Sequence, residues 1–128
     1  MKQYQYGFEK LDVWQDAREL VVTIYKLCQS LPANERFGLS SQMQRASVSI
    51  VSNIAEGVSR NSTKEKCRFL EVAYGSAIEV YCQLIVIKDL CYISEEEYGI
   101  ISAKIQRITN KVNALSKSIQ KKGDIVCM

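Results

Sequence analysis

The first candidates for chemistry are six polar residues in the segment 39–60 that recur every three or four positions. Residues with this spacing lie on one face of an α-helix. A face that combines a carboxylate, a guanidinium, amides and a hydroxyl can bind a ligand, contact another subunit, or form a hydrogen-bonded network that stabilises the fold. The six residues are Gln42, Arg45, Ser49, Asn53, Glu56 and Arg60.

The rest of the sequence does not favour catalysis by this face. The chain has no histidine, which removes the most common general base and the Ser–His and Cys–His nucleophile pairs. Its five cysteines form no Cys-x-x-Cys pair, and cysteine inside a helix is usually a small buried hydrophobe. We therefore predict no enzymatic activity, no catalytic residue, no metal site and no cofactor.

We interpret the polar face instead as part of a structural or subunit-contact network. Glu79 has apolar neighbours on the third predicted helix and is the natural partner for Arg45. Half-buried networks of this kind are tolerated only when every member is satisfied. The predicted network consists of Gln42, Arg45, Asn53, Glu56 and Glu79.

Apolar residues at helical spacing predict four helices, and no segment alternates as a strand would. Ser62 with Glu65, and Ser94 with Glu97, predict the starts of the last two helices by capping boxes, and Asp12 is a candidate cap for the first. Short connections favour an all-α, antiparallel up-down-up-down four-helix bundle. The predicted helices span about 12–31, 39–57, 63–90 and 95–121 in one domain over 1–128, with an N-terminal arm at 1–7 and a frayed tail at 123–128.

Two glycines are predicted to have different structural roles. Gly57 is predicted to end the second helix in a left-handed conformation. Gly75 lies in the middle of the third helix, where glycine costs about 1 kcal/mol relative to alanine, so we expect a close helix–helix approach there. The third helix is apolar on more than one side, which predicts either a central helix or a helix at a subunit interface.

The net charge is only +3, but the cations are unevenly distributed. No acidic residue occurs between positions 100 and 123, and a surface of one charge sign attracts phosphate backbones. The alternatives are a solvated face that only confers solubility, and a protein–protein scaffold that uses the apolar third helix. The candidate nucleic-acid-binding residues are Arg60, Lys64, Lys66, Arg68, Lys104, Arg107, Lys111, Lys117, Lys121 and Lys122.

The location of the protein is also an expectation from the sequence. The first ten residues lack the apolar core of a signal peptide, and no apolar run approaches the roughly 20 residues of a membrane span. We therefore expect a cytoplasmic protein with no membrane association.

Three stretches of the chain resemble one bacterial family: FEKLDVWQDA at 8–17, FGLSSQMQRASVSIVSNIAEGVSR at 37–60, and RFLEVAYGSAIEV at 68–80. They are similar to the four-helix bundle proteins encoded by intervening sequences of bacterial 23S ribosomal RNA genes, often labelled S23 ribosomal proteins. The resemblance covers about residues 8–120. The same family includes the accessory protein of diversity-generating retroelements, a basic homopentamer that binds nucleic acid and a reverse transcriptase.

The resemblance implies a four-helix protomer, a homo-oligomer that is a pentamer, and association with RNA or DNA. The implied partners are further copies of the chain, a nucleic acid, and a reverse transcriptase or another protein. The positions that match recurrent polar residues of the family are Arg45, Asn53, Glu56, Arg60 and Glu79.

Overall fold

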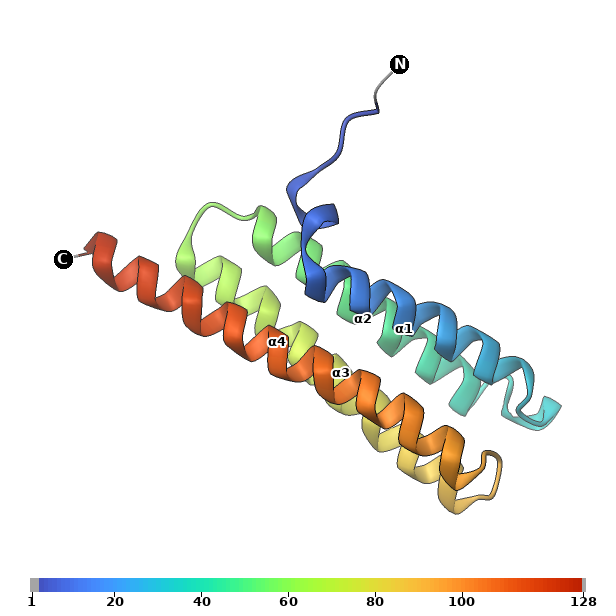
Figure 1. The fold of residues 1–128 in the computed structure, drawn as a ribbon. Helices are drawn as coiled ribbons and strands as arrows, with labels where there is room; N and C mark the ends of the chain where they lie inside the picture. The colour runs from blue at the N-terminus through green and yellow to red at the C-terminus, as the bar shows by residue number, and fades with distance from the viewer. Residues whose placement is uncertain (1–2, 128) are drawn as a thin grey trace.

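A computed structural model describes residues 3–127, with side chains described for residues 3–123. The helices run alternately up and down, each packs against its neighbours in sequence, and the last returns to the first (Figure 1). Within the described residues there is no strand, which confirms the predicted all-α four-helix bundle. The elements are η1 (Gly7–Lys10), α1 (Asp12–Gln29), η2 (Ala33–Glu35), α2 (Leu39–Ser59), α3 (Thr63–Asp89) and α4 (Glu95–Cys127), where η1 and η2 are short 3₁₀ helices.

One hydrophobic core fills the space between the four helices. Its side chains come from positions spaced three and four apart on each helix, as expected for amphipathic helices that bury one stripe. Burying each large aliphatic side chain contributes about 1.5–3 kcal/mol. The largest fully buried side chains are Leu20, Ile24, Met43, Ile50, Ile54, Leu70, Val80, Leu84, Ile87, Ile105, Ile108 and Val112.

α3 is apolar on its outer side as well as on its core side. Val72 and Ile78 are each 44% exposed and Val86 is 40% exposed. We call Val72, Gly75, Ile78 and Val86 the outer face of α3. By length and composition alone α3 could cross a membrane, a test that the core helix of a globular bundle also passes.

The helix ends follow the predicted caps at two of the three sites. The Ser62 hydroxyl accepts the Glu65 amide at 3.1 Å, and Ser94 accepts the amide three residues later at 3.0 Å. The cap predicted at Asp12 is wrong, because Leu11 precedes the first helical residue and has no side-chain cap bond. The Asp12 carboxylate instead contacts Lys111 on α4.

The predicted frayed tail is wrong for residues 123–127. α4 continues to Cys127, while residue 128 lies outside the described residues. The segment contains no proline, and no described glycine adopts a positive φ, so nothing in the backbone interrupts the helix.

Gly57 does not end α2 as predicted. The helix runs on to Ser59, no described glycine has a positive φ, and Cys91 after α3 takes the left-handed conformation with φ 63°. Gly57 is buried against α3: a Cβ built there would lie 3.2 Å from the Lys66 carbonyl oxygen and 3.2 Å from the Phe69 Cβ. The glycine therefore permits close packing of the two helices rather than a turn.

Gly75 has the opposite environment. A Cβ built at this position meets nothing within 4 Å, so the expected close approach does not occur inside the protomer. Gly75 lies on the outer face of α3 between Val72 and Ile78.

The helices differ in length, and this shapes one end of the bundle. α1 has 18 residues and α4 has 33. Because Lys111 of α4 pairs with Asp12, the first residue of α1, the α4 residues after Lys111 run past the start of α1. The chain before α1 turns away from the bundle as an arm (Figure 1).

Candidate nucleic-acid interface

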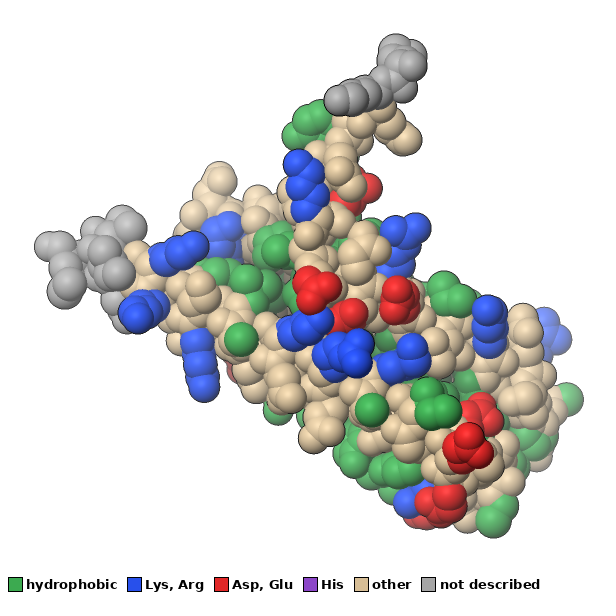
Figure 2. Space-filling view, viewed as in Figure 1, with side chains coloured by type: hydrophobic (Ala, Val, Ile, Leu, Met, Phe, Trp, Pro, Cys, Tyr) green, Lys and Arg blue, Asp and Glu red, His purple; other side chains and the backbone are tan. Residues whose placement is uncertain are grey.

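The structure divides the ten predicted cations into two groups, and the first of them faces acids. Lys111 Nζ donates to Asp12 Oδ2 at 2.5 Å and to Asp16 Oδ2 at 2.6 Å. Lys104 and Arg107 line a small recess together with Asp16 and Glu19. Figure 2 shows acidic and basic side chains in contact in the middle of this face. The prediction of an acid-free surface is therefore wrong here, because α1 supplies acids that the α4 sequence lacks.

Lys111 joins α1 to α4 through paired charges. Its bonds to the two carboxylates raise the pKa of Lys111 above its ordinary 10.5, and the bond from Lys111 lowers the pKa of Asp12 below its ordinary 3.8. At pH values above the ordinary pKa of Asp12, its ionised carboxylate stabilises the fold. This stabilisation is lost as the pH falls through the lowered pKa. At pH values below the ordinary pKa of Lys111, its charged ammonium group stabilises the fold. This stabilisation is lost as the pH rises through the raised pKa.

We expect Lys111→Met to lower Tm at neutral pH, because the Asp16 side chain, only 17% exposed, loses its cation. The Tm difference from the wild type should be largest between about pH 5 and about pH 9 and shrink on either side. Differential scanning fluorimetry across pH measures it. Lys117→Met, at an exposed position of α4, is the control. An equal Tm for the wild type and Lys111→Met at pH 7 contradicts the expectation.

The second group of cations gathers at one end of the bundle, which we call the basic end. The α2–α3 turn and the C-terminal part of α4 meet there, since a Cβ at Gly123 would lie 2.7 Å from the Thr63 hydroxyl (Figure 1). In the sequence, four acids lie within four residues of one of these seven cations: Glu56, Glu65, Glu71 and Asp124, whose side chain lies outside the described part. The cations of the basic end are Arg60, Lys64, Lys66, Arg68, Lys117, Lys121 and Lys122.

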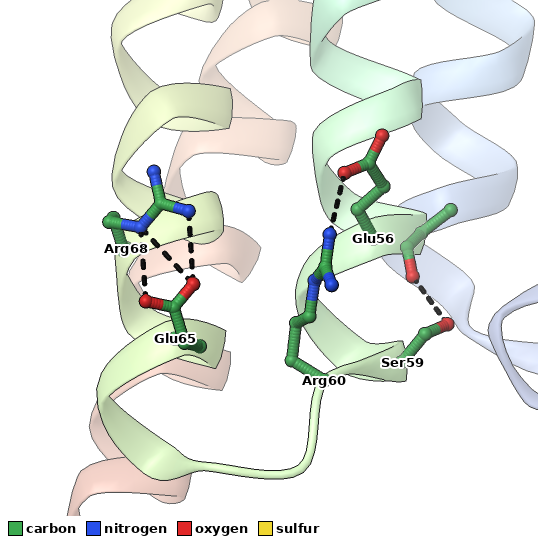
Figure 3. Close-up of polar contacts among 6 residues, drawn as sticks. Glu56, Ser59, Arg60, Glu65 and Arg68 are labelled. Carbon is green, nitrogen blue, oxygen red and sulfur yellow. Dashed lines mark hydrogen bonds and ion pairs between the residues drawn. The ribbon is translucent and has the colours of Figure 1, made fainter.

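Two arginines of the basic end share one aromatic ring. The Arg60 and Arg68 guanidinium carbons lie 4.7 Å and 4.6 Å from the Phe69 ring centroid. Arg60, the residue after α2, also pairs with Glu56 of α2 at 3.4 Å, and Arg68 pairs with Glu65 on α3 at 2.9 Å (Figure 3). The Glu65 bond raises the pKa of Arg68, and the bond from Arg68 lowers the pKa of Glu65.

These contacts orient the arginines without using all of their donors. A guanidinium has five N–H groups. The ion pair at Glu56 occupies one nitrogen of Arg60, and both arginine side chains are about half exposed, at 49% and 57%. Both therefore keep N–H groups that can donate to a phosphate.

The lysines of the basic end form fewer polar contacts than the arginines. Lys66 Nζ donates to the Val58 carbonyl oxygen at 3.1 Å, where a cation is favourable because this is the C-terminal end of α2. Among the residues whose side chains are described, the other four form no ion pair, and all four are exposed: Lys64, Lys117, Lys121 and Lys122.

The polar face of α2 does not form the single network that its spacing predicted. Asn53 Nδ2 donates to the Ser49 carbonyl oxygen at 2.8 Å and to its hydroxyl at 3.1 Å. The Ser49 hydroxyl bonds the Ser76 hydroxyl on α3 at 2.8 Å. This small set joins α2 to α3, while Glu56 pairs with Arg60 farther along the helix.

The predicted Arg45–Glu79 pair is wrong within the protomer. Both residues are exposed, and no ion pair joins them in the described part of the chain. Glu79 Oε2 instead accepts Gln83 Nε2 at 3.2 Å, four residues away on the same helix. Ion pairs between exposed side chains gain little stability, which removes the driving force for this pair. Gln42 is also exposed, and its side chain forms no hydrogen bond or ion pair with the described residues.

Gln83 is a polar residue that sequence reasoning missed. It is only 8% exposed, and its Oε1 has no hydrogen-bond partner among the residues that the structure describes. A buried acceptor without a partner costs about 1–3 kcal/mol. The only sequence signal was a glutamine at a core position of an apolar helix, between Val80 and Ile87.

The cysteines are dispersed over the bundle. Cys28 is buried, its Sγ donates to the Ser40 carbonyl oxygen at 3.7 Å, and burial raises the pKa of its thiol. Cys67, Cys82 and Cys91 are free thiols at other sites. Over the residues that the structure describes, no three His, Cys, Asp or Glu residues lie close enough to hold a metal ion.

Comparison with known proteins finds a matching family and similar solved structures. The family model described as "23S rRNA-intervening sequence protein" matches residues 9–114. The fold is similar to the crystal structure of a protein of unknown function from the S23 ribosomal protein family of Bacteroides thetaiotaomicron. The TM-score is 0.76 at 28% sequence identity, over 82% of this chain and 98% of that chain. No curated protein matches the sequence.

Proposed function

Because this chain belongs to the 23S rRNA-intervening sequence protein family, we propose that it is a non-enzymatic, cytoplasmic nucleic-acid-binding protein that works as a homo-oligomer. RNA or DNA binds at the basic end through phosphate contacts. The observation that carries this proposal is the cluster of seven cations there, four of them exposed and without an ion pair among the residues whose side chains are described.

Three features favour phosphate binding at the basic end over the middle of α4. In the central group, α1 acids pair with Lys111 and line a recess with Lys104 and Arg107, whereas these acids form no contact with the described cations of the basic end. Arg60 and Arg68 are held in place by the Phe69 ring. Preoriented cations lose less conformational freedom on binding, and phosphate contacts release counterions.

The outer face of α3 supports assembly into a homo-oligomer. It exposes the apolar side chains of Val72, Ile78 and Val86 beside Gly75, where a Cβ would meet nothing within 4 Å. A second copy packed there would bury this apolar surface. The number of copies, five, rests on the resemblance to the family. Each added copy would multiply the phosphate contacts.

The test is binding of fluorescently labelled RNA and DNA, measured by anisotropy over a salt series. Wild-type affinity should fall steeply with salt, with log K changing by about 0.7–0.9 per phosphate contact for each unit of log salt. A variant with Lys64→Glu, Lys121→Glu and Lys122→Glu should bind at least tenfold more weakly and show a shallower salt slope.

The matched control changes the net charge equally at the opposite end of the bundle, with Lys26→Glu, Arg36→Glu and Lys88→Glu. This control should retain most of the wild-type affinity. Equal losses in the two triple variants would mean that only net charge matters and would refute a localised interface. No detectable binding by the wild type at low salt would refute the proposal itself.

The outer face of α3 also favours a second candidate function, a scaffold that contacts another protein, such as a reverse transcriptase, without binding nucleic acid itself. Co-purification with the products of neighbouring genes, before and after nuclease treatment, separates the two functions. A complex that persists after nuclease treatment, together with no RNA or DNA binding by the purified protein, favours the scaffold.

A further inference from the structure

A hollow of about 820 Å³ opens at the basic end beside the N-terminal arm. Figure 2 shows hydrophobic side chains recessed between the protruding arm and the C-terminal end of α4, with lysine and arginine side chains around them. The walls come from four parts of the chain: the arm with η1, the end of α2, the start of α3, and α4. The residues that matter most here are Phe8, Leu11, Leu115 and Ile119 on the apolar side and Lys66 and Lys122 on the cationic side.

The hollow exists because α4 runs past the start of α1. α3 still packs against this part of α4, but on the side where α1 would continue only η1 and the residues before it face α4 across the hollow, and they are too short to fill the space that a helix would fill. η1 is nevertheless fixed in place. Glu9 accepts the Tyr6 amide through Oε2 at 2.7 Å, and its carbonyl oxygen accepts Gln15 Nε2 at 2.8 Å. Phe8 packs edge-on against Trp14, with ring centroids 5.0 Å apart.

A series of aromatic rings leads from solvent to this hollow. The centroids of Tyr4 and Tyr6 are 4.9 Å apart, and the Tyr6 and Phe8 rings are stacked at 6.1 Å with an interplanar angle of 16°. Tyr4 is 76% exposed and Tyr6 is 61% exposed. Tyr6 and Phe8 also line the hollow. Tyr6 is the ring that is open to a partner, because Phe8 is half-buried and contacts both Tyr6 and Trp14.

Cations stand at the edge of the same hollow. Lys66 and Lys122 line it, and Lys64 and Lys121 are exposed neighbours in the sequence. Lys66 Nζ uses one of its three donors on the Val58 carbonyl oxygen and keeps two. An apolar, aromatic wall next to several ammonium groups matches a ligand with a flat face and an attached anion. A nucleotide has this chemistry.

We infer that the hollow receives a nucleotide of single-stranded nucleic acid, with its base against Tyr6 and Phe8 and its backbone phosphates along Lys66 and Lys122. This inference rests on the proposed function and adds a preference to it. In a duplex the base faces are covered by neighbouring base pairs, whereas a single strand exposes them for stacking on aromatic side chains. The protein therefore prefers single strands over duplexes.

The test compares three labelled ligands of equal length and label position: a single-stranded RNA without stable secondary structure, its duplex, and a single strand carrying abasic sites. Anisotropy at one salt concentration measures their affinities for the full-length protein. The single strand should bind more tightly than the other two. Tyr6→Ala should weaken single-strand binding by about fivefold or more, the effect of one lost base–aromatic stack, and leave duplex binding unchanged.

Tyr25→Ala is the control, because it removes a partly exposed tyrosine, 42% exposed on α1, outside the hollow. Lys122→Gln should weaken binding of the single strand and of the abasic strand alike, since it removes a phosphate contact. The only tryptophan, Trp14, gives a second measurement, because Phe8 contacts it: single-stranded RNA should change the emission excited at 295 nm, and abasic RNA should change it less.

The outcomes separate this inference from the proposed function. Equal affinity for single strand, duplex and abasic strand, or no effect of Tyr6→Ala, overturns the nucleotide pocket and leaves phosphate binding at the basic end standing. A neighbouring copy that fills the hollow in the oligomer would produce that same equal affinity. No binding of any of the three ligands overturns both.

Discussion

Replacing Gly75 with arginine is expected to leave the protomer folded and to dissociate the proposed homo-oligomer. Gly75 is exposed, and a Cβ at this position meets nothing within 4 Å, so the longer side chain has room in the isolated chain. Arginine also favours a helix by nearly 1 kcal/mol relative to glycine. In an assembly that packs the outer face of α3 against another copy, the same long, charged side chain would stand in an apolar contact and keep the two surfaces apart.

Light scattering coupled to size-exclusion chromatography measures this effect at micromolar concentration. The wild type should elute as an oligomer, and Gly75→Arg should elute as a monomer with an equal or higher helix content by circular dichroism. Gly99→Arg is the matched control, because Gly99 is exposed on α4 and its Cβ position is equally open. A monomeric wild type, or an oligomeric Gly75→Arg variant, would exclude the outer face of α3 as the interface.

The second large effect is expected at Gly57, where leucine should destabilise the fold itself. The first added atom would lie 3.2 Å from both the Lys66 carbonyl oxygen and the Phe69 Cβ. Neither is the free end of a side chain, so α2 and α3 must separate to accept a side chain. Overpacking of this kind costs about 1–3 kcal/mol or more, which exceeds the gain of about 1 kcal/mol in helix propensity.

Urea denaturation monitored by circular dichroism gives the free energy of unfolding. We expect Gly57→Leu to lower it by about 2 kcal/mol. Gly99→Leu, which makes the same change at an open helical position, should leave it equal or higher. A Gly57→Leu variant as stable as the wild type would show that the two helices are not held as closely as the contacts at Lys66 and Phe69 indicate.

The sequence predicts the helices well because the information is local. Apolar spacing of three and four identifies each buried stripe, and the hydroxyls of Ser62 and Ser94 lie three residues before the amides that they accept. Such interactions form within one turn of one helix, so they do not depend on how helices are placed against each other. The same reasoning fails for Asp12, whose carboxylate has a distant partner in Lys111.

Contacts between helices depend on register, which periodicity alone does not determine. Arg45 and Glu79 have suitable charges but do not meet, whereas the Ser49 hydroxyl of the polar face meets the Ser76 hydroxyl, a partner that the spacing did not predict. Gly57 was interpreted as a helix end because glycine there most often acts through its backbone freedom. Its actual role is to give Phe69 and its neighbours room, which depends on the packing distance between α2 and α3.

In the candidate interface, too, local features could be predicted and contacts between helices could not. The cations of the basic end are neighbours in the sequence of two segments, 60–68 and 117–122, and their sign could be predicted directly. The ion pairs that Lys111 forms with Asp12 and Asp16 could not be predicted in this way, because Lys111 is 99 and 95 positions away from them in the sequence. A charge count along one helix leaves out the charges that the adjacent helix supplies.

The long sequence separation of the Lys111 contacts has a consequence for the order of folding. Most helix contacts in this bundle join successive helices, so their loops are short and cost little entropy to close. The contact between α4 and α1 closes a loop that contains nearly the whole chain, and the bonds of Lys111 to α1 are part of this contact. Topology therefore favours rapid formation of the α2–α3 hairpin, and the contact between α1 and α4 should form late. On unfolding, the contact between α1 and α4 should be the first to open.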